Sequence, residues 1–233
     1  MAPSLRNAYI RHALYYANVL AEANTAYVRG GIAQETGLSR ADAELAQVNH
    51  CLLWLVGAAI NPENDVVVLQ VAMAVTQIGL LRLTALERTV LFSAAKVAAE
   101  RLGETRMVII ALGQLGLAAA DLGQLNDAAK LQEQSLMLAQ EIGDRLLESN
   151  ALGNLGELVR VQGDLQRSII YHEQSLMIDH ALYHRSGEAE TLTNLALAYM
   201  DLGDFAQAEA YGEQARSCYQ ELADRHGEAI EAV

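Results

Sequence analysis

Three histidines and one aspartate near residue 180 have the spacing of metal ligands. His180 and His184 stand four positions apart near the expected end of a helix, His172 lies two turns earlier, and Asp179 is adjacent to His180. Imidazole nitrogens and carboxylate oxygens are common ligands of zinc. A metal site is therefore one interpretation of this group.

The register of the sequence favours another interpretation. This part of the chain is repetitive, and the repeat positions equivalent to the two histidines of the pair hold glutamine and aspartate: Gln140, Asp144, Gln220 and Asp224. Such residues are typical of solvated positions beside a loop, where histidine is tolerated. We therefore favour a solvated surface over a metal site and expect no bound metal.

The motifs of common enzyme classes are missing. Lys96 and Lys130 are the only lysines, and no G-x-x-x-x-G-K-[ST] loop for nucleotide phosphates is present. Neither the G-x-S-x-G turn of hydrolases nor the H-E-x-x-H helix of zinc proteases occurs. We expect a protein that is not an enzyme and that carries no cofactor.

The composition predicts helices throughout the chain. Of the 233 residues, 52% are hydrophobic and two are proline, and alanine, leucine, glutamate and glutamine are frequent. No segment alternates apolar and polar residues for long enough to indicate a sheet. The expected fold class is all-α.

The net charge of −13 belongs to one part of the chain. Residues 1–102 hold eight acidic and eight basic residues, whereas residues 103–233 hold 21 acidic and eight basic ones. Nucleic acid is an unfavourable partner for such a segment, because binding to the phosphate backbone needs clustered Lys and Arg.

The cysteines and the hydropathy indicate the compartment. Cys51 and Cys218 lie far apart in apolar helical contexts, which favours buried free thiols over a disulfide. The chain shows neither a signal peptide nor a run of about 20 apolar residues that could cross a bilayer. We expect a cytoplasmic protein without a membrane partner.

The repeat organises the chain. Three similar dipeptides recur at even spacing: Leu115-Gly116, Leu155-Gly156 and Leu195-Ala196. Three copies of a turn that begins with glycine are separated by the same number of residues. The period of about 40 residues is typical of stacked helix pairs. We divide the chain into a helical hairpin at 1–61, a degenerate repeat at 62–102, three clear repeats at 103–226 and the start of a truncated further repeat at 227–233. The chain would then be a fragment of a longer array or a naturally truncated one.

The hydrophobic pattern predicts where helices begin and end. Before the clear repeats we expect helices over 5–29, from Ser39 to about Ile60, over 63–81 and over 85–102, with a connection at 32–38 and Ser39 as an N-cap. Each clear repeat should form two helices, such as 145–162 and 165–182. We expect six leucines and two methionines in the core: Leu112, Leu115, Leu152, Leu155, Leu192, Leu195, Met137 and Met177.

The unit resembles the tetratricopeptide repeat, in the long form found in kinesin light chains. The likeness rests on Leu-Gly in the first helix, glycine at the turn and small residues in the second helix. It implies a right-handed α-solenoid of antiparallel helix hairpins, whose first helices line a concave groove for protein or peptide ligands. The implied groove residues are Ile110, Gly113, Gln114, Leu117, Asp121, Asn150, Gly153, Asn154, Glu157, Arg160, Val161, Glu190, Thr193, Asn194, Leu197, Met200 and Asp201.

Two kinds of groove residue suggest specific contacts with a ligand. Asn154 and Asn194 stand where related arrays place an asparagine that hydrogen-bonds a peptide backbone; a structural bond between adjacent first helices is the alternative. Arg160 could hold a ligand carboxylate, or it could pair with Glu157 or another local acid.

A narrower resemblance concerns the whole chain. Residues 133–145, 154–165 and the segment Arg11-His12-Ala13-Leu14-Tyr15-Tyr16 are similar to the C-terminal sensor arrays of bacterial STAND (NB-ARC) signalling ATPases. This likeness implies a ligand-sensing segment that acts in signal transduction on an upstream nucleotide-binding domain. The alternative is a scaffold that holds a protein complex together.

Overall fold

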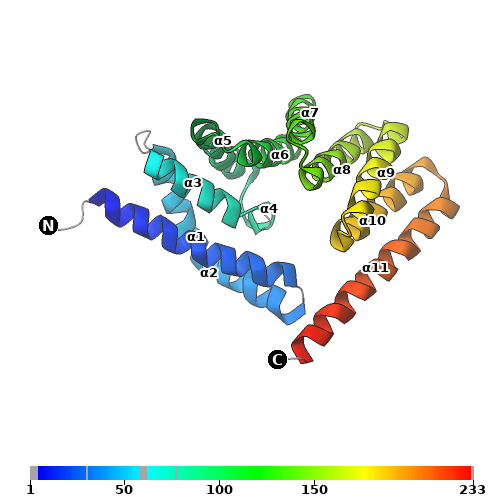
Figure 1. Cartoon of the computed structure of the whole chain (residues 1–233), viewed down its shortest axis with the longest axis horizontal. Coiled ribbons are helices and arrows are strands. Elements are labelled where there is room, and N and C mark those ends of the chain that lie inside the picture. Colours follow the sequence, from blue (N-terminus) through cyan, green and yellow to red (C-terminus); the bar gives the residue numbers. More distant parts are fainter. Residues whose placement is uncertain (1–4, 30, 58–61, 77, 232–233) are drawn as a thin grey trace. The chain divides into compact units, whose positions relative to one another are not determined.

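The computed structural model describes residues 5–29, 31–57, 62–76 and 78–231. In these ranges the chain forms helices joined by turns, and no strand is present. The helices belong to two compact units, residues 1–122 and residues 123–233 (Figure 1). The predicted all-α class is confirmed.

The first unit contains six helices. Helix α1 packs against α2 and α3, α3 packs against α5, and α5 packs against α6. The start of α5 is fixed by a capping box, in which Thr84 accepts a hydrogen bond from the Glu87 backbone and the Glu87 carboxylate accepts one from the Thr84 backbone. The bounds are α1 Leu5–Arg29, α2 Gly31–Gly57, α3 Pro62–Ala74, α4 Ile78–Arg82, α5 Ala85–Leu102 and α6 Thr105–Asp121.

The second unit contains five helices, each packed against the next in the chain. We call the first helix of each clear repeat (α6, α8, α10) an A helix and the second (α7, α9, α11) a B helix. The predicted pairing of successive helices is confirmed for α8 with α9 and for α10 with α11. The bounds are α7 Leu125–Ile142, α8 Arg145–Val161, α9 Leu165–Ala181, α10 Arg185–Leu202 and α11 Phe205–Glu231.

The turns between these helices share one backbone conformation. One residue in each turn from 103 to 203 adopts positive φ, and at every turn but one this residue is glycine. Glycine has no Cβ and adopts this left-handed conformation without strain. The exception is Tyr183, with φ of 54°, so the turn between α9 and α10 holds a side chain where its counterparts have none.

The predicted core is right for the A helices and wrong for two residues of the B helices. All six leucines are buried, none more than 9% exposed. Met137 and Met177 were expected beside them but are 60% and 73% exposed. The B helices bury a different side, which includes Ser135 and Ser175.

Two expectations about the first unit are wrong. Residues 32–38 are not a connection, and Ser39 is not an N-cap, because α2 runs through both from Gly31. Ala33, Gln34 and Glu35 favour helix, and α2 packs against α1. The helix expected over 63–81 is interrupted after α3, where the Thr76 hydroxyl donates to the Met73 carbonyl at 3.1 Å and competes with the helical bond.

Helix α11 is longer than the other B helices. A turn in the repeat position of Gly143 and Tyr183 would fall at Ala223, but α11 continues to Glu231. Alanine favours helix and disfavours the left-handed backbone that such a turn requires. The assignment of 227–233 to a further repeat stays a prediction.

Candidate functional site

The predicted groove residues lie on one side of the A helices, and none of them is buried. Their spacing of three and four positions places them opposite the buried leucines. Half-buried are Ile110, Gly113, Gln114 and Leu117 on α6, Gly153, Asn154, Glu157 and Arg160 on α8, and Thr193, Asn194 and Leu197 on α10; exposed are Asp121, Asn150, Val161, Glu190, Met200 and Asp201.

Arg160 joins α8 to α10. Its Nε and Nη2 donate to the Glu157 carboxylate at 2.8 and 2.9 Å, and its Nη1 donates to Asp201 on α10. Hydrogen bonds to Glu157 and Asp201 hold the pKa of the guanidinium above its ordinary value. The local pairing foreseen as the alternative role is present, so the guanidinium is already engaged by two carboxylates.

Two other predicted residues also have partners within their own unit. Asn154 Nδ2 lies 3.4 Å from Gln132 Oε1 on α7, a long hydrogen bond to a B helix and not to an adjacent A helix. Asp121, at the end of α6, pairs with the buried Arg88 of α5. Asn194 occupies the position on α10 that Asn154 occupies on α8.

A chain of buried hydrogen bonds crosses from α8 through α9 to α10. The hydroxyls of Ser149 and Ser175 are 2.9 Å apart, and Ser175 Oγ is 3.3 Å from Thr191 Oγ1. Thr191 donates to Asp179 Oδ2 at 3.3 Å, and Asp179 Oδ1 is 3.0 Å from His184 Nδ1. We call these five residues the polar chain. It fixes the register of three helices, because buried polar groups need partners at particular positions.

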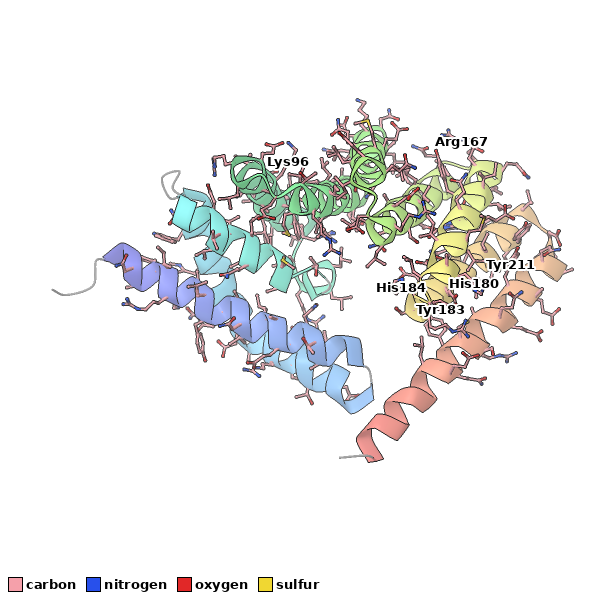
Figure 2. The ribbon with its side chains drawn as sticks, viewed as in Figure 1. Lys96, Arg167, His180, Tyr183, His184 and Tyr211 are labelled. Atoms are coloured by element: carbon pink, nitrogen blue, oxygen red, sulfur yellow. The ribbon has the colours of Figure 1, made fainter. Side chains whose placement is uncertain are left out.

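His180 and His184 have structural partners; His180 lies in the last turn of α9, and His184 lies in the following turn as the N-cap residue of α10 (Figure 2). His184 is half-buried against Asp179, so it is not the solvated residue expected from the sequence. His180 is exposed, but its Nδ1 is 3.0 Å from the buried Glu188 carboxylate. Among the described residues, no three His, Cys, Asp or Glu side chains are grouped as a metal would require.

The contact of His180 with Glu188 has a counterpart in the preceding repeat. Gln140 Nε2 donates to Glu148 Oε1 at 3.1 Å, and Glu148 is also buried. In both cases the last turn of a B helix binds a buried glutamate in the first turn of the next A helix. Arg145 and Arg185, three positions before these glutamates, pair with them as well.

His172 is a buried histidine with no partner. Its side chain is 0% exposed, and neither ring nitrogen has a hydrogen-bond partner. Burial lowers its pKa to about 4, with smaller opposing effects from the charges of Glu157 and Arg160. The ring packs against Gly156 of α8, where an added Cβ would lie 2.6 Å from a ring carbon.

The B helices differ along the side that faces the A helices. We call the four repeat-equivalent residues on this side the inner line. On α7 and α9 all eight are at most 3% exposed, whereas on α11 the fourth is 49% exposed. The inner lines are Ala128, Gln132, Ser135 and Ala139 on α7, Ser168, His172, Ser175 and Asp179 on α9, and Ala208, Gly212, Ala215 and Tyr219 on α11.

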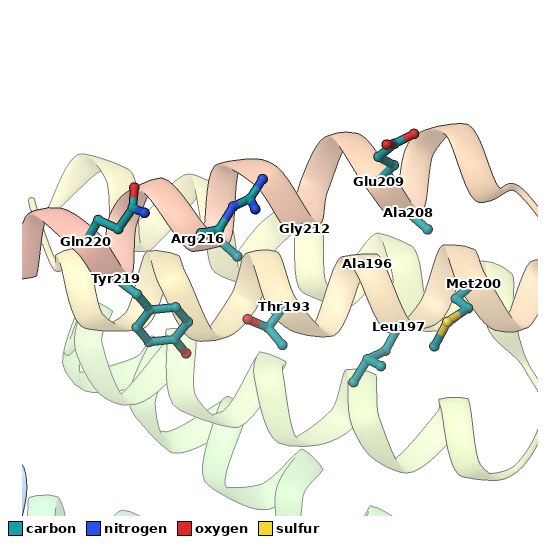
Figure 3. Close-up of a pocket in the computed structure, with 11 residues that line it drawn as sticks. Thr193, Ala196, Leu197, Met200, Ala208, Glu209, Gly212, Arg216, Tyr219 and Gln220 are labelled. Atoms are coloured by element: carbon teal, nitrogen blue, oxygen red, sulfur yellow. The ribbon is translucent and has the colours of Figure 1, made fainter.

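An open hollow of about 750 Å³ lies between α10 and α11 (Figure 3). Thr193, Leu197 and Met200 line it from α10, and Ala208, Gly212 and Tyr219 line it from α11. Arg216 and Gln220 stand on its α11 side. The three α10 residues are among the predicted groove residues. The α11 residues were not predicted, because the resemblance to peptide-binding arrays implies ligand contacts on A helices alone. The sequence did contain a signal for the hollow: Gly212 stands at the repeat position where α7 and α9 have the larger Gln132 and His172.

Cys218 is a free, buried thiol on α11, and burial raises its pKa. This agrees with the prediction for that residue, while the side chain of Cys51 lies outside the described residues. None of the helices in the described ranges is both long and apolar enough to cross a lipid bilayer.

Comparison with protein families identifies the repeats. Residues 107–179 and residues 189–226 each match a tetratricopeptide repeat model. These two stretches are therefore similar to tetratricopeptide repeats. The two matches cover α6 to α9 and most of α10 and α11, and together they span just under half of the chain. No curated protein matches the chain in sequence.

Two solved structures have a similar fold. The crystal structure of BtubC (BKLC) from P. vanneervenii is similar over 93% of this chain and 92% of its own, with a TM-score of 0.62 and 17% identity. A proposed kinesin light chain of Podospora anserina with nearly identical TPR-like repeats covers 88% of this chain and 96% of its own, with a TM-score of 0.56 and 15% identity. At such low identity the likeness concerns the fold.

Proposed function

We propose that this chain binds a protein or peptide along the accessible side of the A helices α8 and α10 and does no catalysis itself. Tetratricopeptide repeats are generally protein-interaction modules, which supports the proposal. The observation that carries it is the row of accessible polar residues shared by α8 and α10. In this row Asn154 and Asn194 are equivalent and half-buried, positions from which an amide can both donate to and accept from a peptide backbone.

The charges of the row favour a basic or polar ligand. Glu157, Glu190 and Asp201 are accessible on α8 and α10, and Arg160 is neutralised by two of them. An acidic ligand would meet uncompensated negative charge, whereas a basic ligand would be attracted at low salt.

A peptide-library binding screen tests this proposal. The wild-type chain is compared with the double variant Asn154→Ala, Asn194→Ala, and we expect hits rich in Lys or Arg whose affinity falls about tenfold or more in the variant, since two backbone hydrogen bonds are lost. Unchanged affinity for every hit would remove these asparagines, and the row with them, from the binding site.

We further propose that the binding serves as the sensing step of a bacterial STAND-type signalling ATPase. The support is the similarity of residues 133–145 and 154–165 to the sensor arrays of such proteins. A ligand that binds one arrangement of the helices better than another would shift an equilibrium in the upstream nucleotide-binding domain. A P-loop ATPase encoded directly before Met1 is expected, and a gene neighbourhood without one would contradict the sensor role.

A scaffold that joins two proteins is the second candidate. The exposed side of α8 and the α11 side of the hollow are accessible surfaces that share no residue, as a scaffold requires. A scaffold would bind its partners without any change in an ATPase activity.

A further inference from the structure

We propose that Ser186 is a nucleophilic serine that accepts an acyl group from an activated ester, and hence a modification site of this chain. It lies in the first turn of α10 and belongs neither to the polar row nor to the hollow. The inference is independent of the proposed binding function.

Three side chains around the start of α10 are joined by hydrogen bonds. Ser186 Oγ is 3.1 Å from His184 Nε2, and His184 Nδ1 is 3.0 Å from Asp179 Oδ1. Ser186 is exposed, His184 is half-buried and Asp179 is buried. A serine, an imidazole and a buried carboxylate in this order can activate a hydroxyl, because the imidazole takes its proton while the carboxylate orients the ring.

The carboxylate of Asp179 is held from its other side as well. Thr191 Oγ1 donates to Asp179 Oδ2 at 3.3 Å, so each carboxylate oxygen has a partner. A His184 ring that donates its Nδ1 proton to Asp179 presents an unprotonated Nε2 to Ser186. This is the tautomer that a general base needs.

Gly187 makes room for the His184 ring. A Cβ added at this glycine would lie 2.3 Å from His184 Nδ1 and 2.8 Å from Asp179 Cγ. The backbone of Gly187 does not have positive φ, and glycine inside a helix lowers stability, so neither a turn nor the helix calls for it. The close approach of the ring to Asp179 accounts for it.

The preceding repeat shows that the fold itself does not need this arrangement. In the turn before α8 the residues equivalent to Asp179, His184, Ser186 and Gly187 are Ala139, Asp144, Leu146 and Leu147. There the aspartate caps the helix by accepting a hydrogen bond from the Leu147 backbone at 3.1 Å. His184 makes no such bond at the start of α10. The turn before α10 therefore lacks a side-chain cap and has a serine, a base and a carboxylate instead.

The proposed step transfers one acyl group. Ser186 Oγ attacks the carbonyl carbon of the ester while its proton passes to His184 Nε2. The backbone N–H of Gly187, which no side chain caps, is available to the negative oxygen of the intermediate. The bond to the leaving oxygen then breaks, and that oxygen takes the proton from His184. One ester on Ser186 and one free alcohol result, so the chain is the acceptor and not a catalyst of repeated transfers.

The test uses para-nitrophenyl acetate as the acyl donor, with peptide mapping by mass spectrometry. We expect acetylation of Ser186 that is faster than that of Ser217, an exposed serine on α11, by about tenfold or more. His184→Gln should slow the reaction of Ser186 about a hundredfold, because the general base is lost. Release of para-nitrophenol should stop after about one equivalent per chain.

Gly187→Ala is the matched control, because it keeps all three groups and changes only their placement. The new methyl displaces the His184 ring, so acetylation of Ser186 should slow about tenfold or more. Circular dichroism checks that both variants are folded. Equal acetylation of Ser186 and Ser217, or a rate at Ser186 that neither folded variant lowers, would overturn the proposal. Continued release of para-nitrophenol would overturn the acceptor role in favour of hydrolysis.

Discussion

Helices α9 and α11 hold equivalent places in consecutive repeats, but their inner lines differ in burial and in polarity. Helix α9 lies between α8 and α10, and its Ser175 and Asp179 bond to both neighbours. At the same positions α11 has Ala215 and Tyr219, and Tyr219 is 49% exposed. The comparison indicates that the polar residues of α9 fix the register of their neighbours through buried hydrogen bonds, whereas α11 packs against α10 without such bonds at these two positions.

The largest effect on stability is expected from Asp179→Ala. The change leaves the Thr191 hydroxyl and His184 without their acceptor in a buried place, so the free energy of unfolding should fall by about 3 kcal/mol. Its counterpart Tyr219→Ala removes a half-exposed ring and should cost less than about 1 kcal/mol. Urea denaturation of both variants measures this, and equal losses would contradict the contrast.

The second test concerns acid. The pKa of His172 is lowered to about 4 in the folded chain, compared with about 6.5 in an unfolded one. The unfolded state therefore binds the extra proton as pH falls between these values, and the stability that neutral His172 provides is complete above about pH 6.5 and lost towards about pH 4.

His172→Gln, which copies Gln132 of the preceding repeat, is the control for this titration. Between about pH 7.5 and pH 5 the wild type should lose about 2 kcal/mol more unfolding free energy than the variant does. Glu157 and Arg160, the charges nearest the ring, are present in both proteins. Parallel pH profiles would show that His172 is not buried as a neutral group.

The third test compares two glycines. In Gly156→Ala the new methyl meets the His172 ring, and overpacking should cost about 1 to 2 kcal/mol despite the better helix propensity of alanine. In Gly212→Ala the methyl meets open space, and we expect a gain of about 0.5 to 1 kcal/mol. Thermal unfolding of the two variants should move in opposite directions; a gain in both would mean that α9 is packed as loosely as α11.

The smallest effect is expected at the turn between α9 and α10. Tyr183 is 87% exposed and holds a positive φ that glycine holds at the equivalent turns. Tyr183→Gly should therefore raise the unfolding free energy by about 1 kcal/mol through relief of backbone strain. A loss of stability would instead show that the contacts of the tyrosine side chain stabilise the fold by more than the backbone strain destabilises it.

Periodicity predicted the regular part of this molecule and could not predict its exceptions. The bounds of α5 to α10 follow from the repeat step, from caps and from glycine turns, which are local signals. The continuation of α2 through Ser39 and of α11 through Ala223 depends on the absence of a strong stop, which a repeat-based expectation does not detect.

The candidate site was likewise predictable only in part. The A-helix residues were placed on one accessible side because their spacing fixes a helix face. The partners of Arg160, the polar chain and the role of His180 were not predictable, since they depend on which residues meet across helices. The wrong position of Met137 and Met177 shows that the facing side of the B helices was misjudged. The hollow at Gly212 was not predicted, because ligand contacts were expected on the A helices alone.

Amide hydrogen exchange of α9 and α11 tests most directly whether α11 is less tightly packed than α9. We predict that α9 exchanges more slowly than residues 205–222 of α11, because α9 opens only when contacts with both neighbours are lost. Equal protection of the two helices would contradict the looser packing of α11.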